Sequence, residues 1–250
     1  MEKNISLELF TSELLPIIDT LYNQQFKNID KAALICADSV AKGGVIQVFG
    51  SGHSIGFGLE MMKRPGSLVP VHNIDMSDFV RRGQVTYEDF RNPDDIFERR
   101  PGIAGKLYNL YNIKPEDAFI IISNSGINGV VIDLAIHAKS LGHKIIIVTS
   151  WQHTTAEESR HPSGKKLYEL GDVIIDNCGP RGDALIETGE VEKICSISSI
   201  TGAFIAQTIG SETCEYLIEK GTQPPVLWSK EKEDYQKHNE DLIKQYQDRI

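Results

Sequence analysis

Two strand–turn–helix units of the same design constrain the fold of this 250-residue chain more than any other sequence feature. The apolar run 45–49 leads into the turn Gly50-Ser51-Gly52-His53-Ser54, and the run 118–122 leads into Ser123-Asn124-Ser125-Gly126. A strand that ends at such a turn and continues as a helix leaves backbone N–H groups unpaired, and these favour an anion such as phosphate. Two such turns in one parallel sheet lie at the same edge, where open α/β sheets bind ligands. The sequence therefore predicts a phosphorylated small molecule held between them.

The rest of the chain alternates apolar runs with helical patterns, which predicts a parallel sheet with crossover helices. The runs are apolar throughout, as is typical of strands covered on both faces. Strands are expected at residues 45–49, 67–71, 118–122, 144–149 and 173–176. Helices are expected at 5–24 (with Pro16 as a kink or start), 29–41, 54–63, 129–141 and 187–220, the last broken near Thr201 and Gly202.

Composition narrows the class of partner. The net charge of −9 argues against a nucleic-acid surface, which needs clustered Lys and Arg. The four cysteines form no C-x-x-C pair and the histidines have no metal-ligand spacing, so we expect no disulfide framework, no metal and no cofactor. No secretory leader or membrane-length apolar run is evident, so we expect a cytoplasmic protein with no membrane partner.

We expect three regions along the chain: an N-terminal helical arm (1–42), a phosphosugar-binding domain (43–225) and a charged C-terminal helix or tail (226–250). Within the domain, residues 75–105 carry many charges of both signs after an expected strand. Two interpretations stay open for this insertion. It is a lid on the ligand side of the sheet, or a solvated excursion whose charges pair with one another.

The second turn carries a resemblance to a known family. The segment Ile121-Ile122-Ser123-Asn124-Ser125-Gly126, with the helix and the strand 145–149 after it, resembles the S-x-S-G phosphate loop of sugar isomerase (SIS) domain proteins. The turn at 50–54 is similar, more loosely, to the family's first glycine/serine loop. The single-domain bacterial group that includes phosphoheptose isomerase is the most similar, over about residues 29–219. The resemblance implies a three-layer α/β/α sandwich of about five parallel strands, a homodimer or homotetramer with sites shared between subunits, and a phosphosugar ligand.

Some positions depart from the family pattern. Asn128 stands where the family commonly has a second hydroxyl after S-x-S-G. Glu60 and Arg64 stand where phosphoheptose isomerases carry a histidine and then a carboxylate. That group's ligand set is therefore not reproduced, and phosphoheptose is not the expected substrate.

The expected phosphosugar-binding residues lie in the two turns: Ser51, Gly52, Ser54, Ser123, Asn124, Ser125, Gly126 and Asn128. Their alternative role is to cap a helix and close a turn, which uses the same geometry. A dinucleotide loop is not favoured at the first turn, because Ile55 occupies the third glycine position of G-x-G-x-x-G. His53 is a candidate acid for sugar-ring opening, because an unperturbed imidazole titrates near neutrality, or simply a turn residue.

The expected reaction is aldose–ketose isomerisation through an enediol, for which a glutamate is the usual base. Glu192 is the first candidate, because its spacing to Ser196 and Gln207 resembles that of related etherases. Glu190 and Glu60 follow. The alternative for each is an ordinary acidic residue near a helix start. Two other functions stay open: a lyase or etherase acting on an N-acetylamino sugar phosphate, and a non-catalytic phosphosugar sensor.

Overall fold

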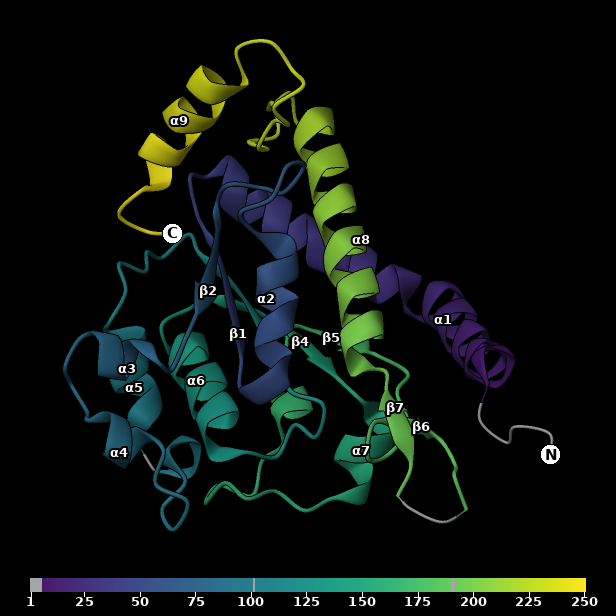
Figure 1. The fold of residues 1–250 in the computed structure, drawn as a ribbon. Helices are drawn as coiled ribbons and strands as arrows, with labels where there is room; N and C mark the ends of the chain where they lie inside the picture. The colour runs from purple at the N-terminus through teal and green to yellow at the C-terminus, as the bar shows by residue number, and fades with distance from the viewer. Residues whose placement is uncertain (1–5, 101, 190–191) are drawn as a thin grey trace.

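The computed structural model describes residues 6–100, 102–189 and 192–250, and its centre is a sheet of five parallel strands in the order β2-β1-β3-β4-β5 (Figure 1). The strands are β1 (Ile46–Gly50), β2 (Val71–Ile74), β3 (Ala118–Ile122), β4 (Lys144–Thr149) and β5 (Val173–Asp176). In the register of β1 and β3, Gly50 lies opposite Ile122, so the two glycine- and serine-rich turns emerge side by side. The strand order reverses between these two strands, the usual ligand position in such sheets.

Helices cover both faces of the sheet. On one face lie α1 (Leu7–Ala41), α2 (Ile55–Met61) and α8 (Ser198–Glu219), and on the other α5 (Ile103–Tyr108) and α6 (Gly129–Ser140). Alternate residues of β3 enter different cores: Ile120 packs with the first group, and Phe119 and Ile121 pack with the second. This three-layer α/β/α sandwich confirms the predicted fold class.

Short elements complete the fold. They are η1 (Gly52–Ser54), α3 (Asp78–Arg81), α4 (Tyr87–Phe90), η2 (Phe97–Arg99), α7 (Trp151–Ala156), η3 (Leu167–Leu170), the antiparallel ribbon β6 (Ala184–Ile186) and β7 (Ile194–Ser196), and α9 (Tyr235–Tyr246). No helix among the described residues is both long and apolar enough to cross a membrane.

The strand predicted at residues 67–71 is wrong by several positions, because β2 begins at Val71. A distant segment takes the preceding residues: Val69 N donates to Pro225 O at 2.8 Å, and Leu68 forms an antiparallel bridge with Val226. Pro70 has no N–H to give to the sheet, so the strand starts after it.

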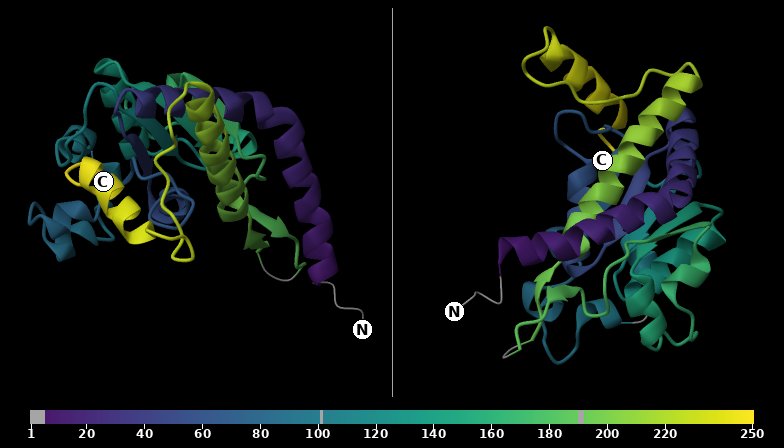
Figure 2. Two further views of the ribbon diagram at one scale, coloured as in Figure 1. Left: turned by 90° about the horizontal axis from the view of Figure 1, so that it is seen from above. Right: turned by 90° about the vertical axis from the view of Figure 1, so that its right-hand side faces the viewer.

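The two N-terminal helices predicted at 5–24 and 29–41 form one continuous helix, α1, with Pro16 inside it. No glycine or proline occurs between residues 17 and 41, so nothing in that stretch breaks the helix. Figure 2 shows that the N-terminal half of α1 extends beyond the body of the protein.

The helix predicted at 187–220 is also wrong at its start and at its break. It begins at Ser198 because the Asp183 carboxylate accepts hydrogen bonds from the backbone N–H groups of Ile197 (3.2 Å) and Ser198 (2.8 Å). It continues unbroken through Gly202, where an added Cβ would lie 3.6 Å from the Phe57 ring. Glu192 therefore lies ahead of the helix, in the turn of the β6–β7 ribbon, and Glu190 lies outside the described residues.

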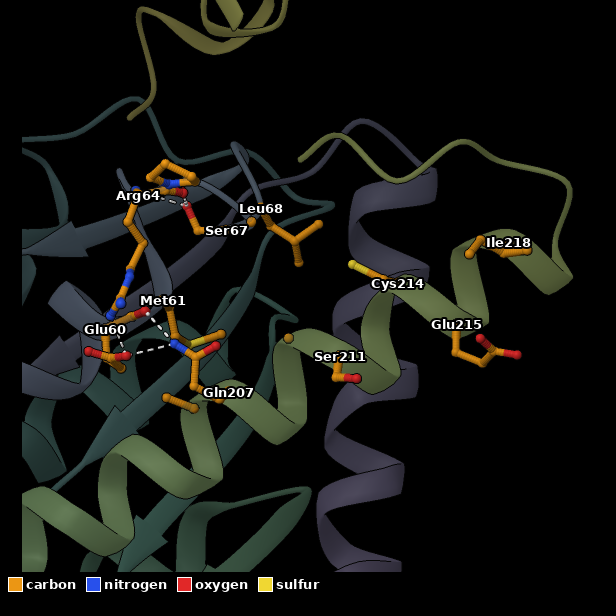
Figure 3. A pocket seen from close by; sticks show the side chains of 14 residues that line it. Glu60, Met61, Arg64, Ser67, Leu68, Gln207, Ser211, Cys214, Glu215 and Ile218 are labelled. Atoms are coloured by element: carbon orange, nitrogen blue, oxygen red, sulfur yellow. Dashed lines mark hydrogen bonds and ion pairs between the residues drawn. The ribbon is translucent and has the colours of Figure 1, made fainter. Parts of the chain in front are cut away.

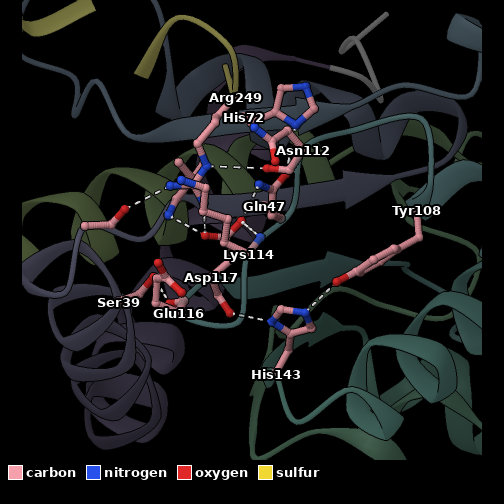
Figure 4. Close-up of polar contacts among 12 residues, drawn as sticks. Ser39, Gln47, His72, Tyr108, Asn112, Lys114, Glu116, Asp117, His143 and Arg249 are labelled. Atoms are coloured by element: carbon pink, nitrogen blue, oxygen red, sulfur yellow. Dashed lines mark hydrogen bonds and ion pairs between the residues drawn. The ribbon is translucent and has the colours of Figure 1, made fainter. Parts of the chain in front are cut away.

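A polar cluster around Asp117 ties the C-terminal segment to the amino end of the sheet (Figure 4). The fully buried Asp117 carboxylate accepts from Val45 N and Gln47 Nε2, both at 2.9 Å, and forms an ion pair with Arg249. Because Gln47 directs its amide nitrogen at the carboxylate, its oxygen is left to accept from His72 Nδ1 at 2.8 Å.

Candidate active site

A cavity of about 230 Å³ opens at the carboxyl edge of the sheet, between the two turns and the helices α2 and α8. Its polar lining comes from four parts of the chain that are distant in sequence: His53, Ser54, Glu60, Asn124, Asn177, Ser198 and Ser199. Parallel strands direct their following turns to one edge, which brings these segments together.

The first turn depends on Gly50. A Cβ added there would lie 2.5 Å from the Ser54 carbonyl oxygen, so a larger residue would force the turn open. Ser54 N donates to Ser51 O at 3.2 Å, and Gly52 takes φ +58°, which glycine adopts without strain. No side chain caps η1 or α2, so the N–H groups at this helix start stay available to a ligand.

In the second turn, a hydrogen bond to the side chain of Ser123 closes the loop. Ser123 is buried, and its Oγ accepts from Gly126 N at 3.1 Å. Gly126 takes φ +64°, and a Cβ there would lie 2.8 Å from Thr154 Oγ1. Asn128 precedes the twelve-residue helix α6 without capping it. Two uncapped helix starts therefore lie at neighbouring strand ends, an arrangement that binds anions.

The start of α8 differs from these two, although Ser198 and Ser199 also line the cavity. The Asp183 carboxylate already satisfies it, since its second oxygen also accepts from Ser198 Oγ at 2.7 Å. A negative charge at this position disfavours another anion. The start of α8 is therefore the least favourable of the three helix starts for an anion.

Asn177 was not predicted from the sequence. It is 4% exposed and donates through Nδ2 to Asn124 Oδ1 at 2.9 Å, while its own Oδ1 accepts from Gly179 N at 2.9 Å. These bonds fix both amides at the cavity wall. Asn177 directly follows the apolar run 173–176, so the criterion applied to the two turns, a polar residue just after a strand, would have identified it.

Glu60 is the glutamate that the fold brings to the cavity. Figure 3 shows its contacts with Arg64 and Gln207. Glu60 Oε1 accepts from Gln207 Nε2 at 2.7 Å and from Arg64 Nη1 at 2.6 Å. His53 lies about two helical turns earlier, so it shares the cavity-facing side with Glu60. Glu192, in contrast, is exposed in the ribbon and is not among the residues that line the cavity.

A sequence model described as "SIS domain" matches residues 9–150, more than half of the chain. The chain belongs to the SIS domain family. Over nearly its whole length it is also similar to uncharacterised UPF0309 proteins: 32% identical to one from Geobacillus sp. strain WCH70 (98% of this chain, 97% of the relative). A Listeria monocytogenes protein of the same group is 35% identical, over 96% and 97% of the two chains.

Two solved structures share the SIS fold. Phosphoheptose isomerase from Neisseria gonorrhoeae superposes with a TM-score of 0.53 at 16% identity, over 83% of this chain and 94% of that one. A phosphosugar isomerase ascribed to capsule formation in Bacteroides fragilis superposes with a TM-score of 0.54 at 16% identity, over 93% and 96%. At this identity the likeness establishes the fold alone.

In this SIS domain, the Asn128 side chain contacts charged residues and does not simply replace the hydroxyl common at this position in the family. Its Oδ1 accepts from Arg160 Nη1 at 3.1 Å, and its Nδ2 lies 3.5 Å from Glu98 Oε1. The 75–105 segment thus reaches the start of α6. It is anchored there by buried Phe79 and Phe97, whose rings lie 5.3 Å apart.

The charges of this segment pair within it. Arg81 binds Asp75 and Asp78, and Arg100 binds Asp89, which holds the pKa of the Asp89 carboxyl below its usual range. Among the residues that the structure describes, no three His, Cys, Asp or Glu side chains form a group that could hold a metal ion.

Proposed function

We propose that this chain binds a phosphorylated sugar or amino sugar between its two turns and isomerises it between aldose and ketose through an enediol. One observation carries the proposal. A single cavity combines the uncapped helix start after the first turn and Asn124 of the second turn with a histidine and a glutamate on one side. SIS family membership supports phosphosugar binding, and two proteins of the same fold bear the names of sugar-phosphate isomerases.

In this proposal the phosphate binds at the edge shared by β1 and β3. Backbone N–H groups of both turns donate to its oxygens, and the hydroxyls of Ser51, Ser54, Ser123 and Ser125 add donors. Gly52 and Gly126 let the backbone approach closely. Asn124 and Asn177, fixed by their mutual hydrogen bond, orient the sugar hydroxyls.

Glu60 then acts as the base. It removes the proton from C2 of the aldose, the electron pair forms the C1–C2 double bond of the enediol, and the proton returns at C1 as the C2 hydroxyl becomes a carbonyl. His53 exchanges a proton with the sugar oxygens as the ring opens and the carbonyl moves. Because Gln207 and Arg64 both hold Oε1, Oε2 is the oxygen that takes the carbon-bound proton.

Glu192 and Glu190 serve this reaction only where a second subunit brings its ribbon to the cavity.

We expect a homodimer or homotetramer, because Leu7, Leu15 and Tyr22 expose apolar surface on the extended half of α1. An amphipathic helix of this kind gains stability when its apolar side is covered. Light scattering after size-exclusion chromatography measures the assembly directly.

Incubation with hexose, pentose and N-acetylamino sugar phosphates in D2O, followed by NMR, tests the function. Isomerisation predicts deuterium at C2 of a ligand that also raises the melting temperature; a ligand at 100 times its Kd adds roughly 2.7 kcal/mol. E60Q should abolish exchange while retaining binding, and E219Q, at an exposed position of α8 outside the cavity lining, serves as its matched control. Binding without exchange for every ligand would favour the sensor. Loss of a C3 substituent would favour the lyase, and no binding would refute the phosphate site.

A further inference from the structure

A second, larger cavity adjoins the first and shares Glu60 with it. It has a volume of about 740 Å³ and runs between the end of α2, the 65–68 segment and the middle of α8. In Figure 3, Glu60, Arg64 and Gln207 lie at one end of this groove and Glu215 and Ile218 lie at the other. The cavity at the turns, at about 230 Å³, is smaller than the roughly 300–1,000 Å³ usual for small-molecule sites, whereas the groove lies within that range.

The charge of the groove argues against a second anionic group. Its charged lining residues are Glu60, Arg64 and Glu215, and Arg64 is already paired with Glu60 at 2.6 Å. The remaining lining combines the exposed hydroxyl of Ser211 with apolar side chains such as Ile218, while the Ser67 hydroxyl is bonded to the backbone of Arg64. Hydroxyl donors and acceptors next to apolar patches suit a neutral sugar ring, which has hydroxyls at its rim and C–H groups on its faces.

We propose that the groove is a subsite for a neutral glycosyl unit, so that the preferred ligand is a phosphorylated disaccharide. Its phosphorylated sugar lies at the turns, and its second ring, joined through C3 or C4 so that C1 and C2 stay free to isomerise, lies past Glu60 along α8. This subsite rests on the phosphosugar site proposed above. Gln207 lies next to both parts of the ligand, because its side chain donates a hydrogen bond to Glu60 and also lines the groove.

Calorimetric titration tests the subsite with two probes, each a glucose 6-phosphate carrying a second glucose at C3 or C4, against glucose 6-phosphate itself. At least one disaccharide should bind about tenfold more tightly than glucose 6-phosphate, a difference of ~1.4 kcal/mol. The variant S211W places an indole in the groove from an exposed position of α8. It should return that disaccharide to the Kd of glucose 6-phosphate.

The matched control is E219W, an exposed position on the same helix outside the groove lining, which should keep the tighter binding. If glucose 6-phosphate binds and no disaccharide binds more tightly, the subsite is refuted and the phosphosugar site stands. A gain that survives in S211W would also refute it. If neither glucose 6-phosphate nor any disaccharide binds, the phosphosugar site fails and the subsite fails with it.

Discussion

Removal of the Arg249 side chain should destabilise the protein far more than its position next to Ile250 suggests. The guanidinium is 7% exposed and faces a fully buried Asp117 carboxylate. It also donates to Gly43 O at 2.9 Å, which ties the last turn of the chain to the start of β1. In R249M, Asp117 keeps its bonds from Val45 and Gln47 but has lost the positive charge opposite it.

Breaking a buried pair by removing one partner costs about 3–5 kcal/mol, because it leaves an uncompensated charge in a low-dielectric site. Total stabilities are about 5–15 kcal/mol, so this loss is a large part of the whole. For a domain of this size it corresponds to a fall in melting temperature of roughly 6–20 °C. Urea unfolding of R249M, followed by circular dichroism, should show the midpoint move with little change in slope.

The control is K237M on α9, which removes an ion pair with Asp241 whose side chains are 79% and 60% exposed. Exposed pairs at this spacing contribute little to stability, and salt screens them. If R249M costs no more than K237M, or if its cost disappears at high salt, the buried pair does not stabilise the fold as reasoned here.

Three further predictions concern the site and its support. G50A should weaken phosphosugar binding by about tenfold or more, since its Cβ would meet the Ser54 carbonyl, whereas G105A, with its nearest atom at 3.7 Å, should bind normally in calorimetry. Burial lowers the pKa of His72 from 6.5 to about 4. The unfolded chain therefore takes up a proton before the folded protein does, and about 3 kcal/mol of stability, present above pH 6.5, is lost as the pH falls to 4. H72Q should remove most of this dependence in denaturant titrations across that range. Q207L should lower kcat by about tenfold with little change in KM, because Glu60 loses a donor that orients its carboxylate; an unchanged kcat would mean that Gln207 does not position the base.

The strands with the clearest sequence signal were predicted to the residue. The runs 118–122, 144–149 and 173–176 coincide with β3, β4 and β5, because each is a continuous apolar segment bounded by turn residues. The errors occur where a distant partner decides the local structure. Residues 67–69 pair with the segment near Pro225, and α8 starts where Asp183 caps it.

The sequence by itself determined the α/β class, the two ligand turns and the family, because strand periodicity and turn chemistry are local properties of the chain. Only the tertiary structure decided which glutamate faces those turns. Glu60 enters the cavity because α2 packs between β1 and α8, whereas Glu192 is in a ribbon that forms ahead of α8. Gln207 reaches Glu60 through a contact across a long sequence separation. Such contacts depend on how layers pack, and that packing leaves no signal in the spacing of neighbouring residues.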